Sequence, residues 1–283
     1  MIGRLSLILG MIKFEHSLFA LPFAFMGAFL AARGLPRGGT CLWILLAMVG
    51  ARSAAMAFNR LVDVRYDATN PRTQQRALVT GMLRKKEVVL FILASTALFF
   101  LSAAMLNTLA LLLSPPALAL LFFYSYTKRF TSLAHLVLGV CLGLTPPAGW
   151  IAVTGDISLS SLLLGIGVCF WVAGFDLIYA CQDVDHDRRE GLHSVPATFG
   201  IAATLAASVA VHVAAFALFV AVGQIAALAW PYWVGVGIVL VSLVVQHAIV
   251  RPGDLSRVNA AFFTSNGVIS LIMAAATLIA YWV

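Results

Sequence analysis

Apolar runs of about twenty residues recur along the whole of this 283-residue chain, and a helix needs about that length to cross a bilayer. Nine candidate spans can be placed, over residues 16–32, 41–58, 88–106, 108–126, 133–153, 160–182, 202–222, 226–249 and 260–282. Because 62% of the residues are hydrophobic and only 10% are charged, nothing is left over for a soluble domain. The chain is therefore predicted to be an all-α membrane protein with nine transmembrane helices in a single bundle.

Basic residues are distributed unevenly between the two sides of these spans, and cytoplasmic loops normally carry the excess of Lys and Arg. With the N-terminus inside, the outer side holds only Arg33 and Arg37, and Arg52 falls inside a span. The cytoplasmic side holds the other fifteen, which are Arg4, Lys13, Arg60, Arg65, Arg72, Arg76, Arg84, Lys85, Lys86, Lys128, Arg129, Arg188, Arg189, Arg251 and Arg257. We expect a multi-pass protein of the cytoplasmic (inner) membrane, with a cytoplasmic N-terminus, cytoplasmic large loops and an outer C-terminus.

The net charge of +7 belongs to these loops, so it indicates topology and contact with anionic lipid rather than nucleic acid. The expected macromolecular environment is the lipid bilayer, and no obligate protein partner is indicated. The N-terminal stretch is interrupted by charged residues and has no small-residue cleavage site, which favours an interfacial segment over a signal peptide.

Six of the eleven acidic residues are aspartates in two clusters. Asp63 and Asp67 follow the second span in NRLVDVRYD, and the second cluster follows the sixth span in FDLIYACQDVDHD, with Asp176, Asp183, Asp185 and Asp187. The two DxxxD elements lie 120 residues apart, each at the cytoplasmic end of an even-numbered span. This weak symmetry predicts one domain over residues 1–283 with two pseudo-repeats, about 1–130 and 131–283.

Residues four apart share one face of a helix, so Asn59, Asp63 and Asp67 are predicted to form one acidic stripe. The second stripe holds Asp183 and Asp187, with Asp176 two turns deeper on the same face. Carboxylates this close repel one another unless a cation lies among them. Oxygen ligands without His or Cys suit Mg²⁺, which commonly bridges carboxylates to a substrate phosphate. We therefore expect a Mg²⁺ site with Asn59, Asp63, Asp67, Asp183 and Asp187 as ligands.

Basic residues accompany these stripes. Arg72 and Arg76 follow the first stripe in NPRTQQR, and Lys128 and Arg129 end the fourth span in YSYTKR. A metal on one side and basic groups on the other is a common arrangement for binding a diphosphate. Charged residues at helix ends are often only solvated anchors, but two acidic clusters that are each followed by basic loops favour a site. With an apolar bundle behind it, the predicted substrate is a diphosphate with a long apolar tail.

These segments resemble a known family. NRLVDVRYDATNPRTQQR resembles the first aspartate motif of the UbiA superfamily of intramembrane prenyltransferases, NxxxDxxxD followed by RTxxR. DLIYACQDVDHD resembles the second motif, and YSYTKR matches the Tyr-xxx-Lys element through Tyr124 and Lys128. The likeness covers the whole chain and is greatest to 4-hydroxybenzoate polyprenyltransferases and their relatives in menaquinone synthesis by the futalosine route.

The resemblance implies a UbiA-like fold and a Mg²⁺-dependent transfer of a polyprenyl group from a polyprenyl diphosphate. The implied acceptor is an aromatic hydroxy acid of the 4-hydroxybenzoate or 1,4-dihydroxy-6-naphthoate type, in respiratory quinone biosynthesis. Asp63, Asp67, Asp183 and Asp187 would take up charge as the diphosphate leaves, and Arg72, Arg76, Tyr124 and Lys128 would bind it.

Four further residues are expected to bind the acceptor. Burying a charge in lipid is costly, so Arg52 must face the bundle interior, two turns below Asn59. Arg52 would bind the acceptor carboxylate, Asp176 would accept its proton, and Glu15 and His16 would close the pocket. The alternative is that Arg52 only neutralises Asp176 or Glu15.

Two other functions compete with this hypothesis. A secondary transporter couples ions to a substrate through intramembrane carboxylates, and it predicts acidic residues near the bilayer midplane. Here most of the aspartates lie at cytoplasmic span ends. The second alternative is a prenyltransferase that acts on haem or on another acceptor.

Overall fold

The computed structural model describes residues 3–12, 17–260, 262 and 265–283, and these residues form helices and loops without a β-strand. The long helices are α2 (Ser17–Ala32), α3 (Gly38–Val62), α5 (Lys85–Leu106), α6 (Thr108–Thr127), α7 (Ala134–Gly143), α8 (Thr145–Thr154), α9 (Leu159–Ala180), α12 (Ile201–Ile225), α13 (Trp230–Ile249) and α15 (Asn266–Ile279). The short helices are α1 (Arg4–Met11), α4 (Val64–Thr69), a 3₁₀ turn (Cys181–Asp183), α10 (Val184–Arg189), α11 (Val195–Phe199) and α14 (Val258–Ala260).

Within the described residues, seven helices are long and apolar enough to cross a membrane. They correspond to the second through eighth predicted spans, with α7 and α8 counted together. The first and last predicted spans correspond to shorter apolar helices, Ala20–Ala32 and Asn266–Ile279. The all-α, multi-pass architecture is confirmed. The count of nine spans is not, because these two helices are short and both follow residues outside the described part of the chain.

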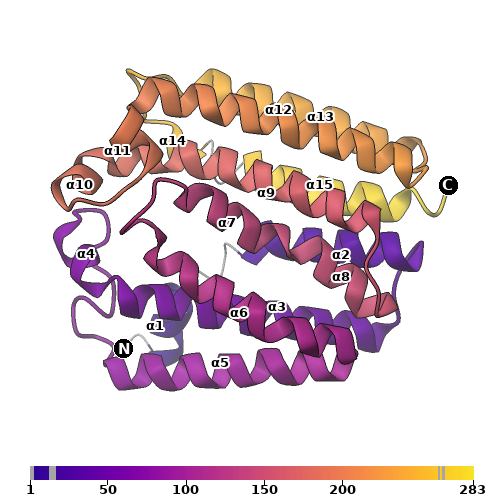
Figure 1. The fold of residues 1–283 in the computed structure, drawn as a ribbon, viewed down its shortest axis with the longest axis horizontal. Coiled ribbons are helices and arrows are strands. Elements are labelled where there is room, and N and C mark those ends of the chain that lie inside the picture. Colours follow the sequence, from indigo (N-terminus) through magenta and orange to yellow (C-terminus); the bar gives the residue numbers. More distant parts are fainter. Residues whose placement is uncertain (1–2, 13–16, 261, 263–264) are drawn as a thin grey trace.

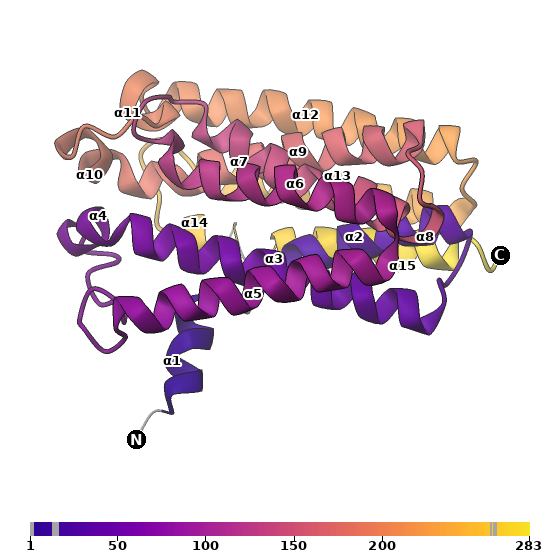
Figure 2. The same ribbon diagram turned by 60° about the horizontal axis from the view of Figure 1, so that its bottom comes forward.

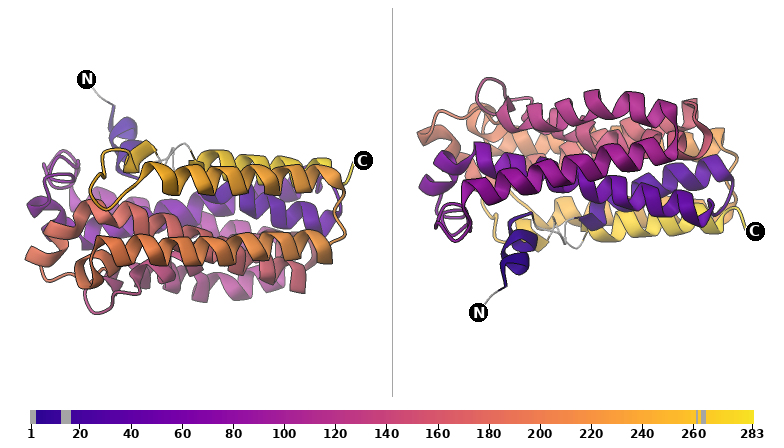
Figure 3. Two further views of the ribbon diagram at one scale, coloured as in Figure 1. Left: turned by 90° about the horizontal axis from the view of Figure 1, so that it is seen from above. Right: turned by 90° about the horizontal axis from the view of Figure 1, so that it is seen from below.

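The long helices run side by side along one axis (Figure 1). The short helices α4, α10 and α11 gather at one end of the bundle, and the C-terminus lies at the other end (Figure 1). Helix α1 projects from the side of the bundle near the α4 end (Figures 2 and 3). The segments that follow the two aspartate motifs therefore meet at one end of the molecule.

The largest core cluster joins α2 to the helices of the C-terminal half, where α9 packs mainly against α12 and α7. Trp171 of α9 is fully buried against the ring of Phe23, at a centroid distance of 5.0 Å, and Phe219 of α12 stacks on the same Phe23. Large apolar side chains such as Leu90, Leu112 and Val213 are instead exposed on the outside. An apolar exterior of this kind suits contact with lipid chains.

The two Pro-Pro pairs behave differently in the fourth and fifth predicted spans. Helix α6 continues through Pro115 and Pro116. In contrast, the predicted span 133–153 is divided, since α7 ends at Gly143 and Pro146 and Pro147 fall in the first turn of α8. Proline is tolerated in a first turn because its missing N–H would have no helical partner there.

Candidate functional site

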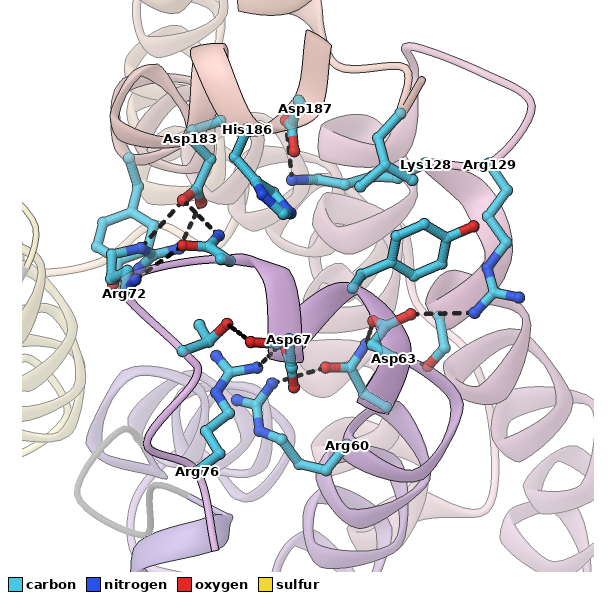
Figure 4. Close-up of a pocket in the computed structure, with 18 of the residues that line it drawn as sticks. Arg60, Asp63, Asp67, Arg72, Arg76, Lys128, Arg129, Asp183, His186 and Asp187 are labelled. Carbon is cyan, nitrogen blue, oxygen red and sulfur yellow. Dashed lines mark hydrogen bonds and ion pairs between the residues drawn. The ribbon is translucent and has the colours of Figure 1, made fainter. Parts of the chain in front are cut away.

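A pocket of about 200 Å³ lies where α3, α6 and α9 end, between the two halves of the chain (Figure 4). Among the described residues, its lining includes five carboxylates (Asp63, Asp67, Asp176, Asp183 and Asp187) and five basic side chains (Arg60, Arg72, Arg76, Lys128 and Arg129). Neutral polar groups complete much of the lining, among them Asn59, Asn70, Tyr124, Ser125, Tyr179 and His186. The aspartates of both predicted clusters except the exposed Asp185, and all the predicted diphosphate-binding residues, therefore share one pocket.

The first acidic stripe passes through a break in the helix. Helix α3 ends at Val62, Asp63 has backbone angles of −94° and 7°, and α4 begins at Val64. The backbone N–H of Asp63 still donates to Asn59 O at 2.9 Å, and that of Asp67 donates to Asp63 O at 2.8 Å. The spacing of four is thus kept across the break, and all three side chains reach the pocket.

Four of the five carboxylates form ion pairs with basic side chains (Figure 4). The pairs are Asp63 with Arg129 at 3.1 Å, Asp67 with Arg76 at 2.5 Å, Asp183 with Arg72, and Asp187 with Lys128 at 3.5 Å. Isolated carboxylates would be costly to bury, and pairing offsets much of that cost. The site thus holds positive and negative groups close together without a large net charge.

Arg72 joins the two aspartate motifs. Its Nε donates to Asp183 Oδ1 at 3.1 Å, its Nη2 pairs with Asp183 Oδ2, and its Nη1 donates to Tyr179 Oη at 2.7 Å. Asn70 Nδ2 also donates to Asp183, at 3.2 Å. Burial lowers the pKa of Arg72, but Asp183 and Tyr179 outweigh this and the pKa is raised overall. The loop after the first motif is thereby fixed against the second motif.

At Asp63, in contrast to Arg72, the effect of burial on the pKa outweighs that of the partners. Burial raises the pKa of its carboxyl, and the hydrogen bond from Arg129 offsets only part of this. Asn59 Nδ2 also donates to Asp63, at 2.8 Å. A positive charge placed near Asp63 would favour its ionised form.

The donor set fits a hard cation in its chemistry, because the predicted ligands offer only oxygen atoms. Within the described residues, no three His, Cys, Asp or Glu side chains are grouped to hold a metal ion. Mg²⁺ does not need such a group, since it is often bound through one or two carboxylates together with substrate phosphates. Asp187 adds a relevant feature, because its buried Oδ2 has the 3.5 Å ion pair with Lys128 but accepts no hydrogen bond from the described residues.

Of the predicted acceptor-binding residues that the structure describes, one lines the pocket and one does not. Asp176 lines the pocket, and its Oδ2 lies 2.7 Å from Nδ1 of His135. Arg52 is half-buried in α3 and is not among the residues that line the pocket. Glu15 and His16 lie outside the described residues.

Sequence reasoning assigned no role to Arg60 or Tyr179, and it grouped Arg129 with Lys128 as a basic residue for a diphosphate rather than as a partner of Asp63. Arg60 is buried and donates to Asn59 Oδ1 at 3.0 Å, Arg129 pairs with Asp63, and Tyr179 accepts from Arg72. All three lie within or beside the motif segments. Their positions in the sequence pointed to the right region, but their side-chain partners depend on long-range packing.

Residues 20–267 match the UbiA prenyltransferase family, which is most of the chain. The chain belongs to the UbiA prenyltransferase family. It is 33% identical over 240 residues to a 4-hydroxybenzoate octaprenyltransferase of Methylobacillus flagellatus, covering 85% of this chain and 81% of that protein. A 4-hydroxybenzoate octaprenyltransferase of Enterobacter sp. is 31% identical over 253 residues, covering 89% of this chain and 87% of its own length.

Solved structures of UbiA homologs have the same fold as this chain. The apo structure of a UbiA homolog from Aeropyrum pernix K1 is 38% identical, with a TM-score of 0.85, covering 94% of this chain and 98% of that one. A UbiA homolog from Archaeoglobus fulgidus bound to GPP and Mg²⁺ has the same fold, with a TM-score of 0.78 at 19% identity, covering 98% of this chain and all of its own. This UbiA-family chain is therefore a membrane-embedded prenyltransferase, and the transporter hypothesis is set aside.

Proposed function

We propose that this enzyme transfers a polyprenyl group from a polyprenyl diphosphate to an aromatic hydroxy acid of the 4-hydroxybenzoate type, with Mg²⁺ as cofactor. One observation carries the proposal, which is that aspartates and basic side chains from both motifs line a single pocket at one end of an apolar bundle. The names of the relatives above support the choice of acceptor. The reaction would belong to respiratory quinone biosynthesis.

The leaving diphosphate is the group that the basic residues are suited to hold. Arg72, Arg76 and Lys128 all line the pocket, and each has a carboxylate partner there. When a diphosphate binds, the basic side chains would leave the carboxylate oxygens and bind phosphate oxygens instead. Both kinds of oxygen are negatively charged and accept hydrogen bonds. Tyr124 lines the same pocket and would add a hydroxyl donor.

The carboxylates freed by that exchange would hold the metal. Asn59, Asp63 and Asp67 would bind it on one side of the pocket, and Asp183 and Asp187 on the other. When bound, Mg²⁺ supplies positive charge that stabilises the leaving diphosphate. The raised pKa of Asp63 fits this role, since a group that is costly to ionise gains most from a neighbouring cation.

The acceptor would lie deeper, between the diphosphate and the bundle. Asp176 lies one turn before Tyr179 on α9 and would remove the ring proton after the new carbon–carbon bond forms. We keep Arg52 as the candidate for the acceptor carboxylate, with Glu15 and His16 at the rim. Because the prenyl cation reacts with water, a pocket backed by the apolar bundle also protects it.

The proposal also includes the orientation of the protein in the membrane. The pocket is lined in part by the basic loops that follow α3 and α6. Helices α4 and α10, which lie in the loops around the pocket, are at the end of the bundle opposite the C-terminus (Figure 1). The positive-inside rule supports a pocket on the cytoplasmic side of the inner membrane.

The test is a transfer assay with the purified protein in lipid vesicles. Prenyl diphosphates of several lengths are offered with 4-hydroxybenzoate, 1,4-dihydroxy-6-naphthoate or haem, with and without Mg²⁺. We expect prenylated 4-hydroxybenzoate and released diphosphate only when Mg²⁺ is present. As a control, Asp156→Ala changes an exposed aspartate in the loop between α8 and α9 and should retain activity. Product from another acceptor alone would contradict the proposed acceptor, and transfer that persists without a divalent cation would contradict the metal.

A further inference from the structure

His135 makes a buried contact with the one pocket carboxylate that has no Arg or Lys partner in the described part of the chain. Its Nδ1 lies 2.7 Å from Oδ2 of Asp176. The side chain of Asp176 is 17% exposed and lines the pocket, whereas that of His135 is 2% exposed and does not. His135 therefore lies behind Asp176 as seen from the pocket.

The packing of α7 against α9 fixes this contact. His135 is the second residue of α7, and Asp176 lies near the end of α9. A Cβ atom at Gly139 would overlap the carbonyl oxygen of Cys169, and one at Gly143 would overlap that of Gly165. Because these glycines let the two backbones touch, a short histidine–aspartate pair can bridge the helices without a longer side chain. The helices lie side by side in Figure 1.

The chemistry of the two groups assigns the hydrogen between them. An ionised carboxylate can only accept, so Nδ1 of a neutral His135 carries the hydrogen and donates it to Asp176. Nε2 is then the acceptor nitrogen of the ring, and it is buried without a hydrogen-bond partner among the described residues. The imidazole thus directs its one N–H at Asp176 and leaves the other carboxylate oxygen available to the pocket.

We propose that His135 is a positioning residue for Asp176, holding its carboxylate in the orientation that accepts the acceptor's ring proton. This inference rests on the proposed function, in which Asp176 is the base. Hydrogen bonds to a base from a second group commonly fix its orientation and its protonation state.

The proposed step breaks one bond to C1 of the prenyl group and forms another. The bond between C1 of the prenyl group and the diphosphate oxygen breaks, and its electron pair leaves with the diphosphate. The ring carbon bonds to C1, and the ring then loses its hydrogen as a proton to the free oxygen of Asp176. The C–H electron pair restores the aromatic ring. His135 keeps its Nδ1–H bonded to the other oxygen throughout, so no further reactant is needed.

The test compares three substitutions of His135 that differ in whether, and where, they place an N–H donor for Asp176. In His135→Asn, the amide nitrogen takes the place of Nδ1, while His135→Gln moves it away and His135→Leu removes it. The control is His212→Leu, since His212 is also 2% exposed and hydrogen-bonded to a side chain, that of His247, but lies outside the pocket. The measurements are kcat, the KM for the prenyl diphosphate, and the kinetic isotope effect with ring-deuterated 4-hydroxybenzoate.

We expect His135→Leu and His135→Gln to lower kcat about 10- to 100-fold, the scale of one hydrogen bond to a charged group. Their isotope effect should exceed that of the unmodified enzyme, with an unchanged KM for the prenyl diphosphate, and His135→Asn should restore both kcat and the isotope effect. His212→Leu should leave the isotope effect unchanged.

Equal behaviour of the Asn and Gln variants would overturn the proposal, as would an unaltered isotope effect in every folded variant. If all three variants fail to fold, His135 is structural and the proposal also falls. Failure of the proposed function itself would be recognised separately, because the unmodified enzyme would then prenylate no aromatic acid.

Discussion

Replacing Arg72 tests whether the pocket holds a diphosphate, because this side chain makes three hydrogen bonds there. A hydrogen bond to a charged group is worth about 1.5–3 kcal/mol. On diphosphate binding, the two bonds to Asp183 would be exchanged for bonds to phosphate oxygens. Because the side chain of Arg72 is 36% exposed, solvent screening reduces their sum to roughly one bond. In Arg72→Ala we therefore expect kcat/KM for the prenyl diphosphate to fall about 10- to 150-fold.

Two further variants separate binding from folding. Arg72→Lys keeps the charge but loses the planar fork, so its loss should be intermediate. Asp183 is 8% exposed, and without Arg72 it keeps Asn70 as its hydrogen-bond partner among the described residues. Arg72→Ala should thus also lower the unfolding temperature, and adding Asp183→Asn should recover part of that loss.

The assay is steady-state transfer at fixed acceptor and saturating Mg²⁺, with thermal unfolding measured in the same detergent. Arg251→Ala is the control, because Arg251 is exposed in the turn after α13 and lies outside the pocket. If Arg72→Ala and Arg251→Ala both change kcat/KM less than about threefold, the diphosphate does not contact Arg72, and the basic residues only set topology.

The other predictions concern the metal, the second basic group and the acceptor. Alanine at any one of Asp63, Asp67, Asp183 or Asp187 should lower turnover at least about 100-fold, the scale of a lost transition-state contact, and near-normal turnover at saturating Mg²⁺ would exclude that residue as a ligand. Lys128→Ala should raise the KM for the prenyl diphosphate and leave the KM for the acceptor unchanged, and the reverse pattern would move Lys128 to the acceptor. Arg52→Ala should raise only the KM for the acceptor; a loss of folded protein with unchanged kinetics in the remainder would make Arg52 structural.

The fold class could be predicted from the sequence because apolar length is a local property. The long helices coincide with the apolar runs, with α7 and α8 sharing one run, and the aspartate motifs could be placed at helix ends for the same reason. The break at Asp63 could not be predicted, since the spacing of four that suggests a continuous helix is preserved across it.

The partners of individual side chains could be predicted from the sequence less completely than the fold class. The sequence suggested that Asp63, Asp67 and Asp183 lie near basic groups, but the choice of Arg129 for Asp63 and Arg72 for Asp183 depends on how α4, α6 and α9 converge. The sequence does not mark His135 as part of the site, because a lone histidine in an apolar run carries no local signal. Its contact with Asp176 becomes visible only when α7 lies against α9.

The equal numbers of carboxylates and basic side chains around the pocket have a thermodynamic consequence. A divalent cation alone would leave excess positive charge in a partly buried site, and a diphosphate alone would leave excess negative charge. Bound together, they nearly restore neutrality, so their binding should be cooperative. Linkage requires that the diphosphate strengthen metal binding by the same factor by which the metal strengthens diphosphate binding. Calorimetric titrations in both orders should therefore give one common coupling factor.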